Sequence, residues 1–322
     1  MSDALPRSRV VAFSGGVGGA KLANGLAQVV DGDALTVVVN TGDDFEHLGL
    51  TVCPDIDSVI YALANKNDTQ RGWGRAGETW QFMAALKELS DQTWFQLGDL
   101  DLATHVFRTW RLKAGATLTA VTAEICASLG IRARVVPMSD APVRTLVHTD
   151  EGVLEFQRYF VARQAQPRVT GFDFAGSEHA QAPAGAAAWL SGEDLAAIVI
   201  CPSNPFVSIR PILAIPGWTT ALRARTRPVI AVSPFVGRRA LKGPAAKMIE
   251  ELGLAPTTLE LAKLYGDLVD AWVIDEVDAA EVTAVERAGV RCIATATVMR
   301  DSQDQVRLAH RVLECAAAVG RS

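Results

Sequence analysis

The chain lacks the sequence features of a membrane protein, a disulfide-rich protein and a zinc enzyme. No apolar run is long enough to cross a bilayer, and Met1–Arg9 has no apolar signal core. The 5 cysteines are scattered without a C-x-x-C pair, and the 5 histidines form no H-E-x-x-H motif. We therefore expect a cytoplasmic protein with reduced thiols, no zinc and no membrane partner.

An excess of basic residues is also absent. The formal net charge is -5, whereas nucleic-acid-binding surfaces are usually basic, so we expect no nucleic-acid partner. No Ser-His-Asp or Cys-His arrangement is visible, so covalent catalysis is not indicated. With 322 residues, of which 49% are hydrophobic, the chain can bury the core of one large α/β domain or of two smaller ones.

A glycine-rich stretch near the start of the chain is the most informative motif. The apolar run Val10–Phe13 leads into Ser14-Gly-Gly-Val-Gly-Gly-Ala-Lys-Leu. Glycines at a strand-to-helix turn permit positive φ, and they let backbone N–H groups approach an anion, usually a phosphate. The stretch fits neither the Walker A motif, since Ala20 replaces its second glycine, nor the dinucleotide motif, since Lys21 replaces its third. A glycine turn that binds no ligand is the alternative.

Short apolar runs alternate with helical patterns at both ends of the chain. They are Leu35–Val39, Ala196–Cys201, Val229–Val232, Ala271–Ile274 and Val290–Ala294. This alternation predicts an α/β fold with a doubly wound, Rossmann-like parallel sheet. From 65 to 192 several helical segments and two candidate strands, 143–147 and 153–161, break the rhythm. We predict a nucleotide- or phosphate-binding core (8–64 and 193–322) and an α+β insertion or cap (65–192).

Small polar or acidic residues follow four of the predicted strands. In such sheets, ligands bind beyond the carboxyl ends of the strands, so these residues predict a binding site. They occur in Ser14-Gly-Gly, Asn40-Thr-Gly-Asp-Asp, Pro202-Ser-Asn-Pro and Ser233-Pro.

Four aspartates lie close together in the sequence around one of these strand ends. They are Asp43, Asp44, Asp55 and Asp57. Converging carboxylates need a cation, and hard oxygen ligands suit Mg²⁺, which commonly assists phosphoryl transfer beside an anion-binding loop. For Asp55 and Asp57, a role as helix caps or in Asx turns is the alternative.

Weaker candidates lie outside these motifs. His105 and Arg108 are three residues apart on one helical face and could reach a phosphate together, or simply face solvent. Trp73 and Trp80 flank a glycine-containing loop and could stack on a planar ligand or pack a cap against the core. Positive charge near the predicted site comes from a basic run, which could equally be solvated surface: Arg238, Arg239, Lys242 and Lys247.

Taken together, these motifs resemble the 2-phospho-L-lactate transferases (the CofD family) of coenzyme F(420) biosynthesis. The resemblance extends in order over nearly the whole chain. Beyond the motifs already given, it rests on Cys53-Pro-Asp-Ile-Asp, Arg71-Gly-Trp-Gly, Glu78-Thr-Trp, Leu97-Gly-Asp-Leu-Asp-Leu-Ala-Thr-His, Val136-Pro-Met-Ser-Asp, Phe156-Gln-Arg-Tyr-Phe-Val, Pro202-Ser-Asn-Pro-Phe-Val-Ser-Ile and Lys242-Gly-Pro-Ala-Ala-Lys. In one loop this chain departs from the family, which usually has glycine at the position of Arg210.

The resemblance implies a Mg²⁺-dependent transfer without an enzyme nucleophile. A guanylylated phospho-acid donates its acid-bearing phosphoryl group to the ribityl hydroxyl of the deazaflavin Fo (7,8-didemethyl-8-hydroxy-5-deazariboflavin). GMP leaves, and coenzyme F(420)-0 or an analogue forms. The acid could be phospholactate, phosphoenolpyruvate or phosphoglycerate, and the sequence leaves this choice open. The resemblance also suggests a homodimer.

With this reaction in mind, we assign provisional roles to the predicted site residues. Asp57 and Asp55 meet the deazaflavin and its ribityl chain, and one of them accepts the hydroxyl proton. Asp44 holds Mg²⁺ together with Asp43. The donor's phosphates and guanosine are bound by residues at three strand ends: Gly15, Gly16, Gly18, Gly19, Ser203, Asn204 and Ser233.

Two other classes of protein remain as alternatives. A non-catalytic regulator of the related YvcK type, which binds nucleotide sugars, would share the glycine loop and the Asn-x-Gly-Asp-Asp strand end. The Cys53-Pro-Asp-Ile-Asp motif and the Trp73 loop favour the transferase. A Rossmann oxidoreductase is disfavoured because Lys21 stands in place of the third glycine.

Overall fold

The computed structural model describes residues 8–320 and confirms the doubly wound α/β fold. Seven parallel strands form the central sheet in the order β14-β13-β10-β9-β1-β2-β5. Their bounds are β1 Arg9–Ser14, β2 Leu35–Val39, β5 Arg134–Pro137, β9 Leu195–Ile200, β10 Val229–Val232, β13 Ala271–Asp275 and β14 Arg291–Thr295. The chain leaves β1 first toward β2 and later, through β9, in the opposite direction. The order of strands therefore reverses between β1 and β9, where ligands bind in folds of this kind.

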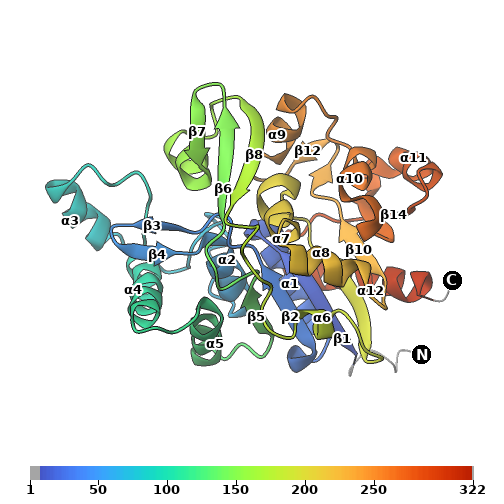
Figure 1. Cartoon of the computed structure of the whole chain (residues 1–322), viewed down its shortest axis with the longest axis horizontal. Helices are drawn as coiled ribbons and strands as arrows, with labels where there is room; N and C mark the ends of the chain where they lie inside the picture. Colours follow the sequence, from blue (N-terminus) through green and yellow to red (C-terminus); the bar gives the residue numbers. More distant parts are fainter. Residues whose placement is uncertain (1–7, 321–322) are drawn as a thin grey trace.

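Helices cover both faces of the sheet (Figure 1). One face packs against α1 Gly16–Val29, α2 Pro54–Leu63, α5 Leu118–Ser128 and α12 Ser302–Val319. The other packs mainly against α8 Pro216–Arg223, α9 Ala245–Glu251, α10 Thr258–Tyr265 and α11 Val282–Arg287. Strand β1 shows why both faces need cover, since Val10 and Ala12 enter one apolar cluster while Val11 and Phe13 enter the other.

Two smaller sheets extend beyond this core. The antiparallel hairpin of β3 (Phe45–His47) and β4 (Leu50–Val52) lies beside the helices on the left of Figure 1, α3 (Gln81–Leu89) and α4 (Asp99–Lys113). A three-stranded antiparallel sheet, β7-β6-β8, stands at the top of Figure 1. Its strands are β6 Arg144–Thr149, β7 Gly152–Glu155 and β8 Val169–Ala175.

The remaining elements are short. They are η1 Gly32–Ala34, η2 Arg158–Ala162, α6 Ala186–Trp189, η3 Pro205–Ile209, α7 Arg210–Leu213, β11 Phe235–Val236, β12 Arg239–Ala240, η4 Gly266–Leu268 and η5 Glu276–Glu281. None of the helices in the described part of the chain is long and apolar enough to span a membrane.

The predicted insertion, 65–192, was wrong in one respect, because β5 belongs to the central sheet. This strand pairs in parallel with Thr36–Val39 of β2, and its Val135 and Val136 enter opposite apolar clusters. Its burial on both faces makes it a core strand, with α5 as part of the crossover that leads into it. The second candidate strand, 153–161, was also too long, since β7 ends at Glu155 and the π-helical turn η2 follows.

Helix α4 is fixed in place by an exchange of caps with α3. Asp99, in the first turn of α4, accepts hydrogen bonds from the backbone N–H groups of Gln81 and Phe82 at the start of α3. In return, Glu78 accepts bonds from the N–H groups of Leu100 and Asp101. Each carboxylate satisfies backbone donors that a helix start leaves unpaired. The exchange orients the inner face of α4 toward the carboxyl ends of β1 and β2.

Candidate active site

A cavity of about 920 Å³ lies at the point where the strand order reverses. Most of the residues predicted for the site line it, although they come from distant parts of the sequence. They are Gly15, Gly16, Gly18, Asp43, Asp55, Asp57, Ser203, Asn204 and Ser233. Gly19 and Asp44 are not among the lining residues.

The glycine loop is shaped by close packing as much as by backbone conformation. Gly16 alone in this stretch has a positive φ, +64°. A Cβ on Gly15 would lie 2.5 Å from Asp55 Oδ2, and one on Gly18 would lie 2.5 Å from the Pro202 carbonyl oxygen. Gly19 is needed for packing only, because its Cβ would lie 2.5 Å from the hydroxyl oxygens of Ser14 and Ser203. The loop thus opens α1 toward the cavity, with the positive end of the helix available to an anion.

Asp55 ties the glycine loop to the end of β2. Its Oδ1 accepts a 2.6 Å hydrogen bond from the Gly16 N–H, and its Oδ2 accepts a 2.9 Å bond from Asn40 Nδ2. The same Asn40 amide lies 3.2 Å from Asp43 Oδ1, and Gln157 Nε2 donates to Asp43 Oδ2 at 3.2 Å. These bonds hold the carboxylates of Asp43 and Asp55 close together in the lining of the cavity.

Two of the carboxylates that line the cavity, those of Asp43 and Asp55, are destabilised in their charged form by their surroundings. Burial raises the pKa of Asp55 to about 6. Burial, with the neighbouring charges of Asp55 and Asp44, raises the pKa of Asp43 well above its ordinary value. A divalent cation would offset both effects, and hard carboxylate oxygens are the ligands that Mg²⁺ prefers. The donor set therefore fits the predicted metal.

Asp44 does not share this position. It is buried behind the cavity wall, where its Oδ1 has no hydrogen-bond partner. Burial raises its pKa to about 7, against the opposing charge of Arg144 and a hydrogen bond with Cys53. Of the two aspartates predicted to hold Mg²⁺, only Asp43 reaches the cavity.

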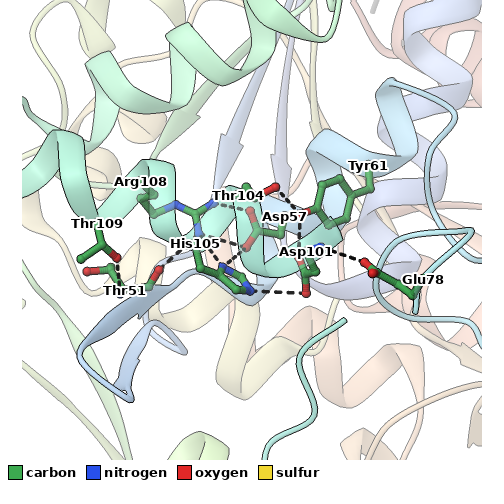
Figure 2. A network of polar contacts seen from close by, with 9 residues as sticks. All are labelled: Thr51, Asp57, Tyr61, Glu78, Asp101, Thr104, His105, Arg108 and Thr109. Carbon is green, nitrogen blue, oxygen red and sulfur yellow. Dashed lines mark hydrogen bonds and ion pairs between the residues drawn. The ribbon is translucent and has the colours of Figure 1, made fainter. Parts of the chain in front are cut away.

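Asp57 belongs to a second polar network that connects α2 with α4 (Figure 2). Both of its carboxylate oxygens accept hydrogen bonds from the guanidinium of Arg108. His105 Nδ1 lies 3.6 Å from Asp57 Oδ2, and His105 Nε2 lies 3.3 Å from Asp101 Oδ2. Asp101 Oδ1 accepts a 2.6 Å bond from the Tyr61 hydroxyl. Asp57, Asp101 and His105 are the group of three among the described residues that has metal-ligand spacing, since one ligand atom from each lies within 4.8 Å of the others.

Burial and charge oppose each other in this second network. Burial acts to lower the pKa of Arg108, but the charge of Asp57 raises it above its usual range. Burial would raise the pKa of Asp101, yet its bonds to His105 and Tyr61 lower it. The sequence suggested that His105 and Arg108 might contact a phosphate or solvent, and for Arg108 the structure supports neither. Arg108 is buried against Asp57, and His105 lines the cavity with 1% of its surface exposed.

Part of the cavity lining is apolar and aromatic. Trp73, Phe95, Phe156, Phe160 and Leu241 form this part. The Trp73 loop is stiffened by Arg71, whose guanidinium carbon lies 5.2 Å from the Trp73 ring centre and 4.6 Å from that of Trp80. An aromatic lining of this kind suits a flat, largely apolar ligand.

The strand ends β9 and β10 complete the floor of the cavity. Ser203 Oγ accepts a bond from the Gly15 N–H at 3.0 Å and donates to the Gly15 carbonyl at 2.7 Å. Asn204 Oδ1 caps the turn η3 through the Phe206 N–H at 2.9 Å, and Ser233 Oγ accepts from the Phe235 N–H at 3.2 Å. These side chains therefore hold the loops in place as well as lining the site.

Of the four residues in the basic run, one lines the cavity, and the other positive charge comes from elsewhere in the chain. Lys242 lines the cavity, as do Lys21, Arg71 and Arg300. Lys247 instead bonds to Glu251 and to the Pro167 carbonyl. Burial lowers the pKa of Lys21. Its Nζ donates a hydrogen bond of 2.7 Å to the Met299 carbonyl oxygen.

Several site residues were not singled out from the sequence. Asn40 and Gln157 bridge the carboxylates, while Tyr61 and Asp101 complete the second network. Asn40 stood in a recognised strand-end motif, and Asp101 lies one helical turn before His105, which is the spacing of side chains on one face. Gln157 stood in the family motif Phe156-Gln-Arg-Tyr-Phe-Val, but no sequence pattern assigned it a role in the site.

A parallel sheet whose strand order reverses beside a glycine loop, with a cavity at that point, defines a Rossmann-like α/β protein with a candidate ligand site. Residues 10–314 match the family described as 2-phospho-L-lactate transferase CofD. The chain belongs to this family of transferases, which acts in coenzyme F(420) biosynthesis.

Named relatives support the same assignment. The chain is 40% identical over 317 residues to a phosphoenolpyruvate transferase of Streptomyces griseus, covering 97% of this chain and 99% of that one. It is 36% identical over 306 residues to a 2-phospho-L-lactate transferase of Methanosarcina mazei, covering 95% of this chain and 99% of that one. The fold is similar to that in a crystal structure of a UPF0052 family member from Bacillus halodurans, with a TM-score of 0.64. The superposition covers 95% of this chain and 99% of that one. At 15% identity, that likeness shows a shared fold only.

Proposed function

We propose that the protein transfers a three-carbon phospho-acid group from a guanosine diphospho-linked donor to the ribityl hydroxyl of Fo. The products are GMP and coenzyme F(420)-0 or an analogue of it. The group transferred is 2-phospholactyl, enolpyruvyl phosphate or 3-phosphoglyceryl. The names of the relatives support the first two of these, and the choice among the three is for experiment.

The observation that carries this proposal is that one cavity is lined by two kinds of residue. The glycine loop at the N-terminus of α1 suits phosphate groups. The aromatic side chains of Trp73, Phe156 and Phe160 suit a planar deazaflavin. A cavity of about 920 Å³ is at the upper end of the size range of small-molecule sites, so two ligands can meet in it.

The chemistry needs no enzyme nucleophile. The ribityl hydroxyl oxygen attacks the phosphorus that bears the acid, and the bond from that phosphorus to the bridging oxygen breaks. The electron pair of that bond leaves with GMP, and the hydroxyl proton passes to a carboxylate. We assign this role to Asp57, whose side chain lines the cavity.

Asp43 is the residue best placed to hold Mg²⁺, with Asp55 beside it. When bound, the ion would neutralise charge on the phosphates of the donor. Asp55 has a second task that the sequence did not indicate, because its bond to the Gly16 N–H sets the shape of the anion-binding turn.

We also propose that the protein works in the cytoplasm as a homodimer. An apolar stripe on the outer face of α4 supports pairing of two chains, since Leu100, Val106 and Trp110 are 41%, 49% and 62% exposed. The helix has acidic residues in its first turn and basic residues in its last. Antiparallel packing of two copies across a twofold axis would bring these opposite charges together.

The proposal is tested by product analysis. Purified protein is mixed with Fo, Mg²⁺ and each of the three guanylylated acids, and the products are separated and weighed by mass spectrometry. A phospho-acid adduct of Fo, lost on chelation of Mg²⁺, supports the proposal, and its mass identifies the acid. Absence of an adduct with all three donors, together with tight binding of a nucleotide sugar, would place the protein among the regulators instead.

A further inference from the structure

Arg108 is the most completely buried charged side chain near the cavity. None of its surface is exposed, and it ranks among the largest fully buried side chains in the described part of the chain. It does not line the cavity, whereas its partner Asp57 does. The guanidinium therefore contacts the carboxylate of Asp57 without itself lining the cavity; Figure 2 shows the pair.

The ion pair between Arg108 and Asp57 is bidentate. Nη1 donates to Asp57 Oδ2 at 3.1 Å, and Nη2 donates to Asp57 Oδ1. Nη1 also lies 3.4 Å from the Thr51 carbonyl oxygen, at the end of the β3–β4 hairpin. A planar fork that grips both oxygens of a carboxylate fixes the plane of that carboxylate as well as its position.

The surrounding residues leave this pair little freedom to rotate. His105 lies one turn before Arg108 on α4, and its Nδ1 is 3.2 Å from Arg108 Nη1. On its other side, His105 faces Asp101, which the Tyr61 hydroxyl holds at 2.6 Å. The Tyr61 hydroxyl oxygen in turn accepts a bond from the Thr104 hydroxyl at 2.9 Å. Two side chains of α4, Arg108 and His105, thus contact Asp57 and are themselves held in place by further polar contacts.

We propose that Arg108 is a positioning residue, which orients the Asp57 carboxylate toward the acceptor hydroxyl. This inference rests on the proposed function and deepens it. The two lone pairs that the guanidinium does not use remain directed to the cavity, where the ribityl hydroxyl would lie. Arg108 itself touches neither substrate.

A lysine at this position would keep the charge but lose the fork. A single ammonium can satisfy only one carboxylate oxygen at a time, and its placement is less constrained. Small misplacements of a reacting group lower rates steeply, by about 100-fold for about 1 Å. The donor, in contrast, is bound by the glycine loop, which has no contact with Arg108.

The first test is therefore the variant Arg108→Lys, measured with Fo, Mg²⁺ and the donor that gives product. We expect kcat to fall by about 10- to 100-fold while the KM for the donor changes by less than about 3-fold. The matched control is Arg111→Lys, on the same helix, whose guanidinium pairs with Glu124 on the surface. It is expected to retain the activity of the parent protein, because surface ion pairs contribute little.

The second test separates positioning from general damage to the fold. In Arg108→Ala, millimolar guanidinium chloride is expected to restore part of kcat, whereas ammonium chloride at the same concentration is not. Circular dichroism and the affinity for GDP check that both variants are folded and bind nucleotide. If one of the two variants, Arg108→Lys or Arg108→Ala, does not fold, the test rests on the variant that remains soluble, compared with the parent protein.

The outcomes distinguish this inference from the function on which it rests. If the parent protein makes no adduct with any donor, the proposed function fails. If the parent is active and Arg108→Lys matches its kcat, the positioning role is wrong. An equal loss of kcat and of GDP affinity, without rescue by guanidinium, would also overturn it in favour of a purely structural role.

Discussion

The carboxylate of Asp55 and the backbone N–H of Gly16 are joined by a hydrogen bond of 2.6 Å. The bond links the end of β2, through α2, to the turn that opens α1. It explains why a glycine loop that fits no common phosphate-binding motif can still hold one shape. The acidic residues and the anion-binding loop are therefore parts of a single site, and a change in one should be felt in the other.

Substitution of Gly15 tests this connection. In Gly15→Ala the added methyl would lie 2.5 Å from Asp55 Oδ2 and 2.6 Å from Ser208 Cβ, so the loop or the aspartate must move. We expect the affinity for GDP, measured by calorimetry, to fall at least about 10-fold, which corresponds to about 1.4 kcal/mol. The control is Gly171→Ala, in β8, where the nearest atom would be 3.9 Å away. Unchanged affinity in Gly15→Ala would show that the loop does not bind the donor.

The raised pKa of Asp44, about 7, predicts a particular dependence of stability on pH. The folded state holds the proton that the unfolded chain releases near its ordinary pKa of 3.8, so ΔG of unfolding falls as the pH rises from about 4 to about 7. Below that window the group has no effect, and above it the full penalty is present. Asp44→Asn removes the penalty.

Thermal unfolding without Mg²⁺ measures this effect directly. We expect the Tm of Asp44→Asn to exceed that of the parent at pH 8 by at least about 2 °C and the difference to shrink toward pH 5. A variant that is less stable than the parent at pH 8 would show that the buried carboxylate is stabilised by a contact that the asparagine cannot replace.

Trp73 is the exposed aromatic residue best placed to contact Fo. Trp73→Ala is expected to weaken Fo binding by about 10-fold, because an aromatic stacking contact contributes about 0.5–1.5 kcal/mol beyond its buried area. Quenching of Fo fluorescence gives the affinity. Leu89→Ala is the control, since that exposed side chain lies on α3 and does not line the cavity. Equal affinities in both variants and the parent would remove Trp73 from the Fo site.

The same helix provides a test of the homodimer. Val106→Glu introduces a charge at the centre of the exposed stripe of α4. Light scattering after gel filtration is expected to show a dimer for the parent and a monomer for the variant, because two such charges would face each other across the twofold axis. A dimer in both cases would mean that two chains pair through another surface.

Much of this site could be predicted from the sequence, because its parts follow buried strands directly. The glycine loop, Asn40 to Asp44 and Ser203 are placed by strand ends, and parallel strands bring their ends to one edge of the sheet. The strand β5 was assigned to the insertion because long helical segments separate it from β2 in the sequence. The direction of Asp44 could not be predicted either, since adjacent residues at a strand end face opposite ways.

The Arg108 network shows what the sequence cannot convey. Arg108 and Asp57 are 51 residues apart, on helices whose relative placement depends on the exchange of caps between α3 and α4. An arginine three residues after a histidine on an amphipathic helix is ordinarily a surface residue. Only the packing of α4 against α2 turns it into a buried partner of a site carboxylate.

The proposed reaction is a direct transfer between two substrates held in one cavity, without a covalent intermediate on the enzyme. Single-turnover release of GMP, with enzyme in excess over the guanylylated donor, tests it most directly. We predict that GMP appears only when Fo is present and in equal amount to the Fo adduct. Release of GMP in one burst without Fo, in proportion to the enzyme, would contradict this proposal and show that a residue of the chain accepts the phospho-acid first.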